Sequence, residues 1–325
     1  MQSTKILKIQ GAIIDKKELE KYLENIASDH ILEKTSSKST YPINSVINNL
    51  EYITKTYDIL NNNLKNGITI HPAGEWILDN LYIIEEAAKS VIKELSLKKY
   101  THTLGLGNGM YKGYARIYVL ASEIVAYTDS KIDSKILKDL LSAYQRKKTL
   151  NMEEIWDINI YLKIALIQNI AVICEKIYSA ELQKCKVEDI IERLVEKKDR
   201  KEQKFTNKYK IKDINNKEFK YPFIEYMSYK LKKYGKMATG YTYVLEEQVE
   251  KMGTNVSEVI KKEHYDMALR KISIGNAIKS LKELQTINFL EIFEEINGVE
   301  DILRKTLKIY ILRCLSKLSL CIEML

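Results

Sequence analysis

Four polar side chains at helical spacing are the first candidates for chemistry. Glu75, Asp79, Tyr82 and Glu86 follow one another at steps of four, three and four residues, and Trp76 lies beside the first of them. On a helix these steps place side chains along one stripe. Carboxylates beside aromatic rings suit sugar hydroxyls, and a pair of carboxylates is the machinery of glycoside hydrolysis.

Hydrolysis is nevertheless not expected from this stripe. A glycosidase places its two acids on either side of the scissile bond, whereas side chains one turn apart on one helix point the same way. The stripe also lies opposite the apolar face of its helix. We therefore predict a solvated or structural stripe and no catalytic residue. Contact with a glycan or a partner domain is the alternative for Glu75, Trp76, Asp79, Tyr82 and Glu86.

A second group of polar and aromatic residues is interpreted as structural. Arg116 and Glu123 are seven residues apart on one helix face, which favours a buried or half-buried Arg–carboxylate pair that joins helices. Trp156 is expected in the core, with its indole N–H bound to an acceptor. The set predicted to brace neighbouring helices is Arg116, Tyr118, Glu123, Asp129, Tyr144, Gln145, Glu154, Trp156 and Asn169.

Other signals for catalysis or metal binding are weak. The histidines have no neighbour at metal-ligand spacing, so we expect no metal site. They are His30, His71, His102 and His264. The Gly-Leu-Gly-Asn-Gly run at 105–109 lacks a preceding strand and the closing Lys-Ser/Thr of a phosphate loop, and is interpreted as a connector. We expect no autonomous active site and no cofactor.

The elements that would position these residues are helices. Pro and Gly are scarce, at 3 and 12 residues, and apolar residues recur at helical spacing. The predicted helices cover 15–28, 43–64, 72–95, 114–127, 133–148, 151–181 with a charged continuation over 186–205, 223–235, 241–252, 256–284 and 288–304. The predicted fold class is all-α, either a multi-helix bundle or irregular stacked helical pairs.

Composition suggests a boundary and one alternative function. A Lys-rich segment over 208–221 is interpreted as a linker between an N-terminal helical domain, 1–207, with its His-Pro-Ala-Gly-Glu-Trp motif, and a C-terminal helical region, 222–325. The net charge of +8 comes almost wholly from 186–236, with sixteen basic and nine acidic residues. Because acidic residues are interleaved, a solvated helical surface is favoured over a nucleic-acid-binding one.

Cysteine use and hydropathy bear on location. The four cysteines form no CxxC pair, which favours a reduced, cytoplasmic protein. The most apolar segment, 156–177, is interrupted by charged residues such as Asp157 and Lys163, so a buried core helix is expected rather than a membrane span.

Several unrelated short motifs occur in one order along the chain. The first is Pro-Ala-Gly-Glu-Trp-Ile-Leu-Asp-Asn at 72–80, followed by Glu-Glu at 85–86. The others are Tyr-x-Arg-x-Tyr at 114–118, Glu-x-Val-Ala-x-Thr-Asp at 123–129, Ala-Tyr-Gln at 143–145, Leu150 with Glu154 and Trp156, Leu166 and Ile167 with Asn169, and matches within 293–304. Together they resemble the N-terminal region of cyclic β-1,2-glucan synthases, large bacterial membrane glycosyltransferases of family 84.

The resemblance implies a non-catalytic module, or a truncated copy, that scaffolds or docks a UDP-glucose-dependent transferase domain. The implied partners are the transferase and membrane domains, in the same or a neighbouring chain, and β-1,2-glucan. The module would then be cytoplasmic and peripheral to the inner membrane through those domains.

The chain also departs from the family pattern. Ala115 stands where the family tends to have Pro, Tyr127 where it has His, and Gln168 where it has Glu. After Arg304 the likeness ends, and residues 305–325 form an apolar, basic tail. Such an abrupt change is expected if the coding sequence is truncated or read in a shifted frame. No Asp-x-Asp motif of a transferase occurs. The alternatives are a stand-alone glycan-binding module and a basic nucleic-acid-binding protein.

Overall fold

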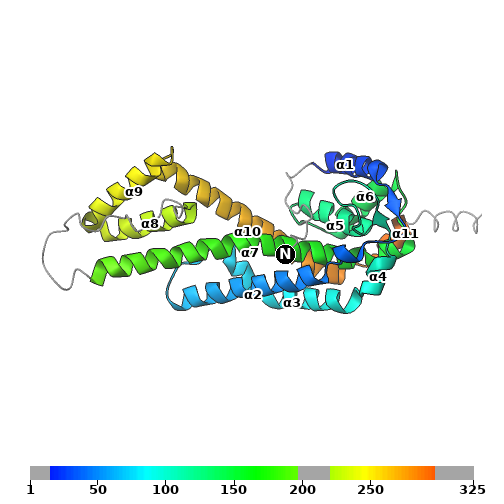
Figure 1. Ribbon diagram of the computed structural model, residues 1–325, viewed down its shortest axis with the longest axis horizontal. Helices are drawn as coiled ribbons and strands as arrows, with labels where there is room; N and C mark the ends of the chain where they lie inside the picture. The colour runs from blue at the N-terminus through cyan, green and yellow to red at the C-terminus, as the bar shows by residue number, and fades with distance from the viewer. Residues whose placement is uncertain (1–14, 197–219, 297–325) are drawn as a thin grey trace, which may run out of the picture. The chain divides into compact units, whose positions relative to one another are not determined.

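Helices dominate the computed structural model, which describes residues 15–196 and 220–296 (Figure 1). The described residues form eleven α-helices and one two-stranded sheet, so the all-α prediction is confirmed. The helices are α1 Lys16–Asp29, α2 Ile43–Lys65, α3 Gly74–Glu94, α4 Leu97–His102, α5 Arg116–Tyr127, α6 Ser134–Gln145, α7 Met152–Glu196, α8 Tyr221–Tyr234, α9 Thr239–Lys251, α10 Val256–Thr286 and α11 Phe289–Ile296.

Local signals explain where several helices begin and end. The Asp15 carboxylate accepts from the Lys17 N–H at the start of α1, and the Asp133 carboxylate accepts from the Ile136 N–H at 2.7 Å at the start of α6. Gly67, with φ +69°, follows the end of α2. A left-handed backbone conformation at this position costs a glycine little free energy, because glycine has no Cβ atom.

The structure differs from the sequence prediction in a few elements. The helix expected from 72 begins at Gly74, within the usual uncertainty of helix ends. Helix α4 was not predicted, and the glycine run contains strand β2, Gly105–Leu106, which pairs antiparallel with β1, Leu32–Glu33. The predicted linker up to residue 219 and the tail 305–325 lie outside the described residues.

Contacts divide the chain into two compact units, each built from discontinuous segments. Unit 1 contains the described residues of Met1–Ile43, Lys89–Leu166 and Lys279–Leu325, and unit 2 those of Asn44–Ala88 and Ile167–Ile278. Helices α3, α7 and α10 therefore contribute residues to both units.

Unit 1 encloses α5, in which every residue from Arg116 to Ala126 is buried. Helix α6 packs against α1 on one side and against α11. The hydroxyl oxygen of Ser280, on α10, accepts from the Ile132 N–H at 2.9 Å and donates to the Ser130 carbonyl at 2.6 Å, which ties the α5–α6 connection to α10.

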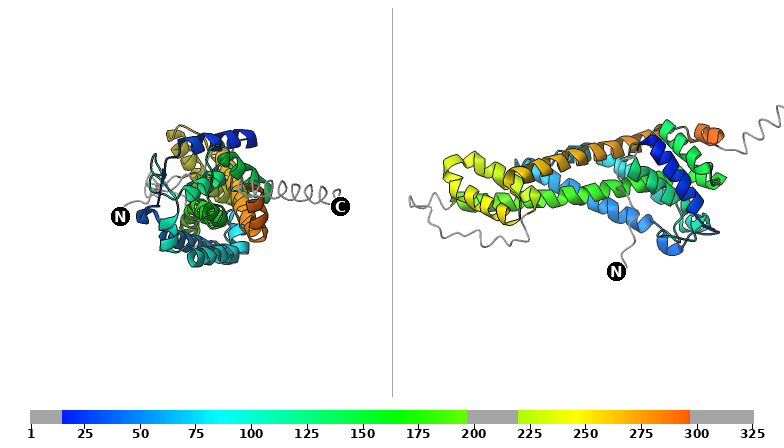
Figure 2. Two further views of the ribbon diagram at one scale, coloured as in Figure 1. Left: turned by 90° about the vertical axis from the view of Figure 1, so that its right-hand side faces the viewer. Right: turned by 90° about the horizontal axis from the view of Figure 1, so that it is seen from above.

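Unit 2 has its own apolar core around the C-terminal part of α7. Helix α8, yellow-green in Figures 1 and 2, lies beside this part of α7, and α9, in yellow, packs against α8. The core is made by Val187 and Ile191 of α7, Phe223, Ile224, Tyr226, Met227 and Leu231 of α8, Ala238, Leu245 and Val249 at α9, and Val259 of α10.

Among the described residues, only helix α7 contains a stretch that passes the length and hydropathy criteria for a membrane span. Its stretch Met152–Glu192 is long and apolar enough to cross a membrane, with a mean hydropathy of 1.4 over the most apolar window. Of that window, 89% is buried inside the fold, as the sequence predicts for a core helix.

Candidate functional site

The stripe on α3 is open to solvent. Glu75, Asp79, Tyr82 and Glu86 are all exposed, and the Tyr82 side chain is 64% exposed. The backbone leaves helical geometry at Asn80, with φ −132° and ψ 16°, between the second and third of these residues. The four side chains thus lie on one face without enclosing a substrate.

The first turn of α3 does more than face solvent, because it contacts α10 within unit 2. The Lys271 ammonium lies 3.2 Å from the Glu75 carboxylate. The indole of Trp76 covers Gly275 so closely that a Cβ built there would lie 3.0 Å from its Cε2. Glu75 and Trp76 therefore serve a helix–helix contact.

Just before α3, His71 is fully buried as a neutral ring. Its Nδ1 accepts from the Ala73 N–H at 3.0 Å, and Nη1 of Arg270 lies 3.4 Å from its Nε2. Burial, followed by the nearby cations Arg270 and Lys184, lowers the pKa of His71 to about 3. His71 thus serves as an internal cap of the turn into α3.

A buried carboxylate on α7 holds the same segment in place. Glu181 is 0% exposed and accepts from the Asn63 amide at 2.6 Å, the His71 N–H at 2.7 Å and the Lys184 ammonium at 3.0 Å. Lys184 also donates to the Thr69 carbonyl at 2.7 Å. Three donors, one of which is the Lys184 ammonium, satisfy the buried charge, so the loop over residues 66–73 is fixed on α7.

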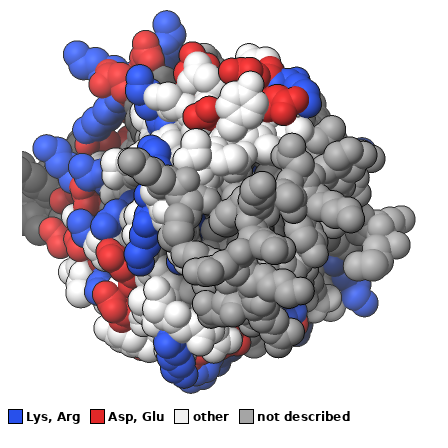
Figure 3. Space-filling model, turned by 90° about the vertical axis from the view of Figure 1, so that its left-hand side faces the viewer, with Lys and Arg blue, Asp and Glu red and all other residues white. Residues whose placement is uncertain are grey.

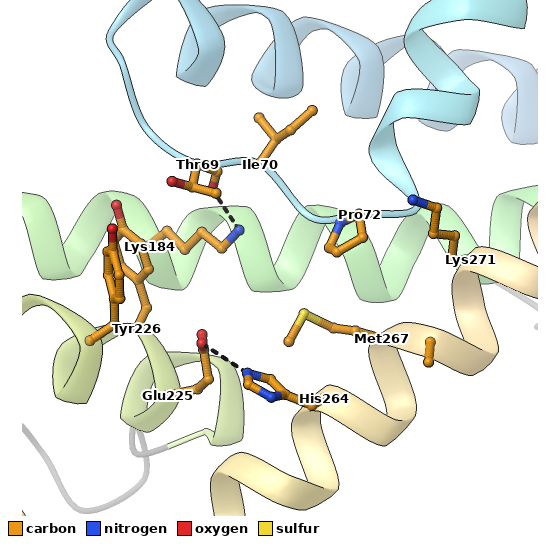
Figure 4. Close-up of a pocket in the computed structure, with 11 residues that line it drawn as sticks. Thr69, Ile70, Pro72, Lys184, Glu225, Tyr226, His264, Met267 and Lys271 are labelled. Atoms are coloured by element: carbon orange, nitrogen blue, oxygen red, sulfur yellow. Dashed lines mark hydrogen bonds and ion pairs between the residues drawn. The ribbon is translucent and has the colours of Figure 1, made fainter.

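A pocket of about 460 Å³ opens beside this network in unit 2 (Figure 4). Lys184 reaches from α7 toward Thr69, and the imidazole of His264 on α10 lies beside the Glu225 carboxylate of α8, with Nε2 3.4 Å from Oε1. The lining residues are Thr69, Ile70, Pro72, Lys184, Glu225, Tyr226, Tyr229, His264, Met267, Ala268 and Lys271.

The pocket lacks the pair of opposed carboxylates that glycoside hydrolysis uses. Glu225 is the one carboxylate among the lining residues, so no second acid faces it across the space. Within the described part of the chain, no group of three or more His, Cys, Asp or Glu residues is arranged to hold a metal ion.

In unit 1 the predicted Arg–carboxylate pair exists with a different partner. Arg116 is fully buried and forms a two-pronged contact with Glu154, with Nε 2.8 Å from Oε1 and a second bond from its terminal nitrogen. The prediction of Glu123 as partner is wrong, because Glu123 accepts instead from the Tyr22 hydroxyl at 3.0 Å. The pair joins α5 to the start of α7.

Neighbouring residues of the predicted set surround this ion pair. The guanidinium of Arg116 lies 5.9 Å from the centre of the Tyr144 ring, whose hydroxyl is 2.8 Å from Nδ1 of His30. Gln145 accepts from the Leu150 N–H at 3.3 Å and donates to the carbonyl of Ile296 at 2.9 Å.

The remaining members lie at different depths. Tyr118 is buried and stacks on Tyr161 with ring centres 5.8 Å apart, and Asn169 is 3% exposed in unit 2. Asp129 has a left-handed backbone, φ 49°, at the end of α5. Trp156 is 46% exposed, so its prediction as a core residue is wrong. It lies in the first turns of α7, away from the fully buried stretch from 160 to 170.

The sequence contains a signal for the residues that were missed. Glu181 and Lys184 are oppositely charged and three residues apart, a spacing at which side chains on one helix can pair. Nothing local identifies His71 as their partner, because it is 110 residues from Glu181 in the sequence.

Surface charge is mixed on the face shown in Figure 3, where Lys and Arg side chains alternate with Asp and Glu. The densest part of the basic segment, 197–219, lies outside the described residues. The nucleic-acid alternative therefore gains no support from the coloured part of this face.

Comparison with known proteins gives one informative similarity. No family model matches the chain. The chain is 23% identical over 261 residues to the cyclic beta-(1,2)-glucan synthase NdvB of Rhizobium meliloti (strain 1021). The match covers 79% of this chain and 9% of that protein. The predicted resemblance is thus confirmed: this helical chain is similar to one region of a cyclic β-(1,2)-glucan synthase.

Proposed function

We propose that this chain is a non-catalytic helical module of a cyclic β-1,2-glucan synthase-like protein, which scaffolds or docks the UDP-glucose-dependent transferase domain. The similarity over 79% of the chain to a small region of a glucan synthase carries the proposal. The catalytic domains would come from the same protein or from another chain.

The use of the matching polar residues supports a bracing role. Arg116 and Glu154 both belong to the motifs that resemble the family, and together they form a fully buried ion pair between two helices. Side chains committed in this way hold a fold together and are not themselves free to contact a sugar.

The proposed location follows from the same role. The module would lie in the cytoplasm, where UDP-glucose is available, and would meet the membrane only through its partner domains. Burial of 89% of the most apolar window of α7 is consistent with a position outside the bilayer.

Co-purification tests the docking role. The full chain, carrying an affinity tag, is expressed with the transferase polypeptide of a glucan synthase from the same genome. We expect the transferase to be retained with the tagged chain and not with a tagged unrelated helical protein. Equal recovery with both baits would contradict the proposal.

A further inference from the structure

We propose that the pocket of unit 2 is a binding site for a neutral saccharide, formed by one or two glucose units of a β-1,2-linked chain. The preference for a neutral sugar comes from the pocket itself, whereas the choice of β-1,2-linked glucose rests on the proposed function.

The size and walls of the pocket suit a small polar ligand with apolar faces. Its volume of about 460 Å³ lies within the range of small-molecule sites. Ile70, Pro72 and Met267 supply apolar wall, and the Tyr229 side chain is 52% exposed, so its ring is open to contact. The C–H face of a pyranose ring packs on surfaces of this kind.

The charges of the pocket argue against an anionic ligand. Both lysines in the wall already face a carboxylate: Lys184 lies 3.0 Å from Glu181, and Lys271 lies 3.2 Å from Glu75. A phosphate or nucleotide is bound tightly by cations that are free to form charge-assisted bonds. The paired cations favour a ligand without charge.

Hydrogen-bonding groups remain available at the rim. The carboxylate of Glu225, 19% exposed, provides an acceptor, and the imidazole of His264, 58% exposed, provides a donor or an acceptor. Sugar hydroxyls can both donate and accept, so they match this mixed set.

The wall is also fixed before any ligand arrives. Lys184 is held by Glu181 and by the Thr69 carbonyl, and the hydroxyl of Tyr226 donates to Glu188 at 2.5 Å. A preformed wall lowers the ordering cost of binding. The pocket is therefore suited to recognise a flexible saccharide segment.

Isothermal titration calorimetry of the full chain tests the proposal, with the β-1,2-linked glucose disaccharide and pentasaccharide as probes. We expect saturable binding of at least one probe, and weaker or no binding of UDP-glucose and inorganic phosphate. Tyr229→Ala and Glu225→Gln should each weaken binding about tenfold or more, since a tenfold loss corresponds to about 1.4 kcal/mol. Ala268→Trp, which fills the pocket from an exposed position, should abolish binding.

Tyr265→Ala is the matched control, because Tyr265 is a 65% exposed tyrosine of α10 outside the pocket. Circular dichroism verifies that each variant keeps its helix content. The proposal is overturned by the absence of saccharide binding, by tighter binding of phosphate or UDP-glucose, or by equal affinity of the pocket variants and the control. Co-purification with the transferase does not depend on this pocket. Absence of saccharide binding would therefore overturn this inference without contradicting the proposed docking role.

Discussion

Replacing Glu154 by Gln removes the charge of a fully buried ion pair while keeping its volume. The side chains of Arg116 and Glu154 are both 0% exposed. Glu154 Oε2 also accepts from the Asn151 N–H at 2.9 Å, and the Asn151 side chain accepts from the Glu154 N–H at 2.7 Å, so the residue caps α7 as well. The substitution therefore disturbs an ion pair and a helix start together.

The expected loss follows from the geometry. Two unit charges at about 4 Å interact by about 4 kcal/mol at the effective dielectric constant of about 20 that suits proteins. Removing one partner of a buried pair leaves the other charge uncompensated and costs about 3–5 kcal/mol. Native domains have about 5–15 kcal/mol of stability, so Glu154→Gln should lower the urea midpoint by a large fraction.

Urea unfolding followed by far-ultraviolet circular dichroism measures this loss. The control is Glu51→Gln, which breaks a solvent-exposed pair with Lys55 and should leave the midpoint unchanged. Converting both Arg116 and Glu154 to Met should restore stability relative to the single variant, because no lone charge is then buried. A midpoint for Glu154→Gln equal to that of the control would refute the claim of a desolvated pair.

Three further predictions concern single side chains. Because the pKa of His71 is lowered to about 3 in the fold and is about 6.5 when unfolded, its contribution is complete above pH 6.5 and is lost as the pH falls toward 3. The contribution of His71 to the free energy of unfolding should therefore fall by at most about 1.4 kcal/mol for each pH unit. In the His71→Gln variant, the pH dependence of the free energy of unfolding, measured with urea between pH 7 and 5, should be flatter than in the unaltered protein. Burial raises the pKa of the Cys174 thiol to about 12, so an alkylating reagent should label half-buried Cys185 before Cys174 in the native protein, as read by peptide mass spectrometry; equal rates would contradict its burial. Iodide should quench the fluorescence of exposed Trp156 in a Trp76→Phe variant more strongly than that of Trp76 in a Trp156→Phe variant, and the reverse order would contradict the exposure of Trp156.

Local signals in the sequence predicted the helices well. The helix start at Asp15, the helix end at Gly67 and the buried centre of α7 each depend on residues within a few positions of one another. The exposed stripe of α3 follows from helical spacing alone. Features of this kind can be predicted from the sequence without knowledge of tertiary contacts.

Partners across the chain could not be predicted in the same way. Arg116 was assigned to Glu123 because seven residues make two helical turns, yet its partner Glu154 is 38 residues away on another helix. The network of Asn63, His71 and Glu181 spans more than one hundred residues. Only the packing of helices brings such groups together.

The central claim is that this chain braces or docks a glucan synthase and does not itself transfer glucose. The direct measurement incubates the purified, helical chain with radiolabelled UDP-glucose, divalent cations and a β-1,2-glucan acceptor, and counts label in the glucan. We predict incorporation no greater than without protein. Incorporation that rises with protein concentration and yields β-1,2-linked product would contradict the account.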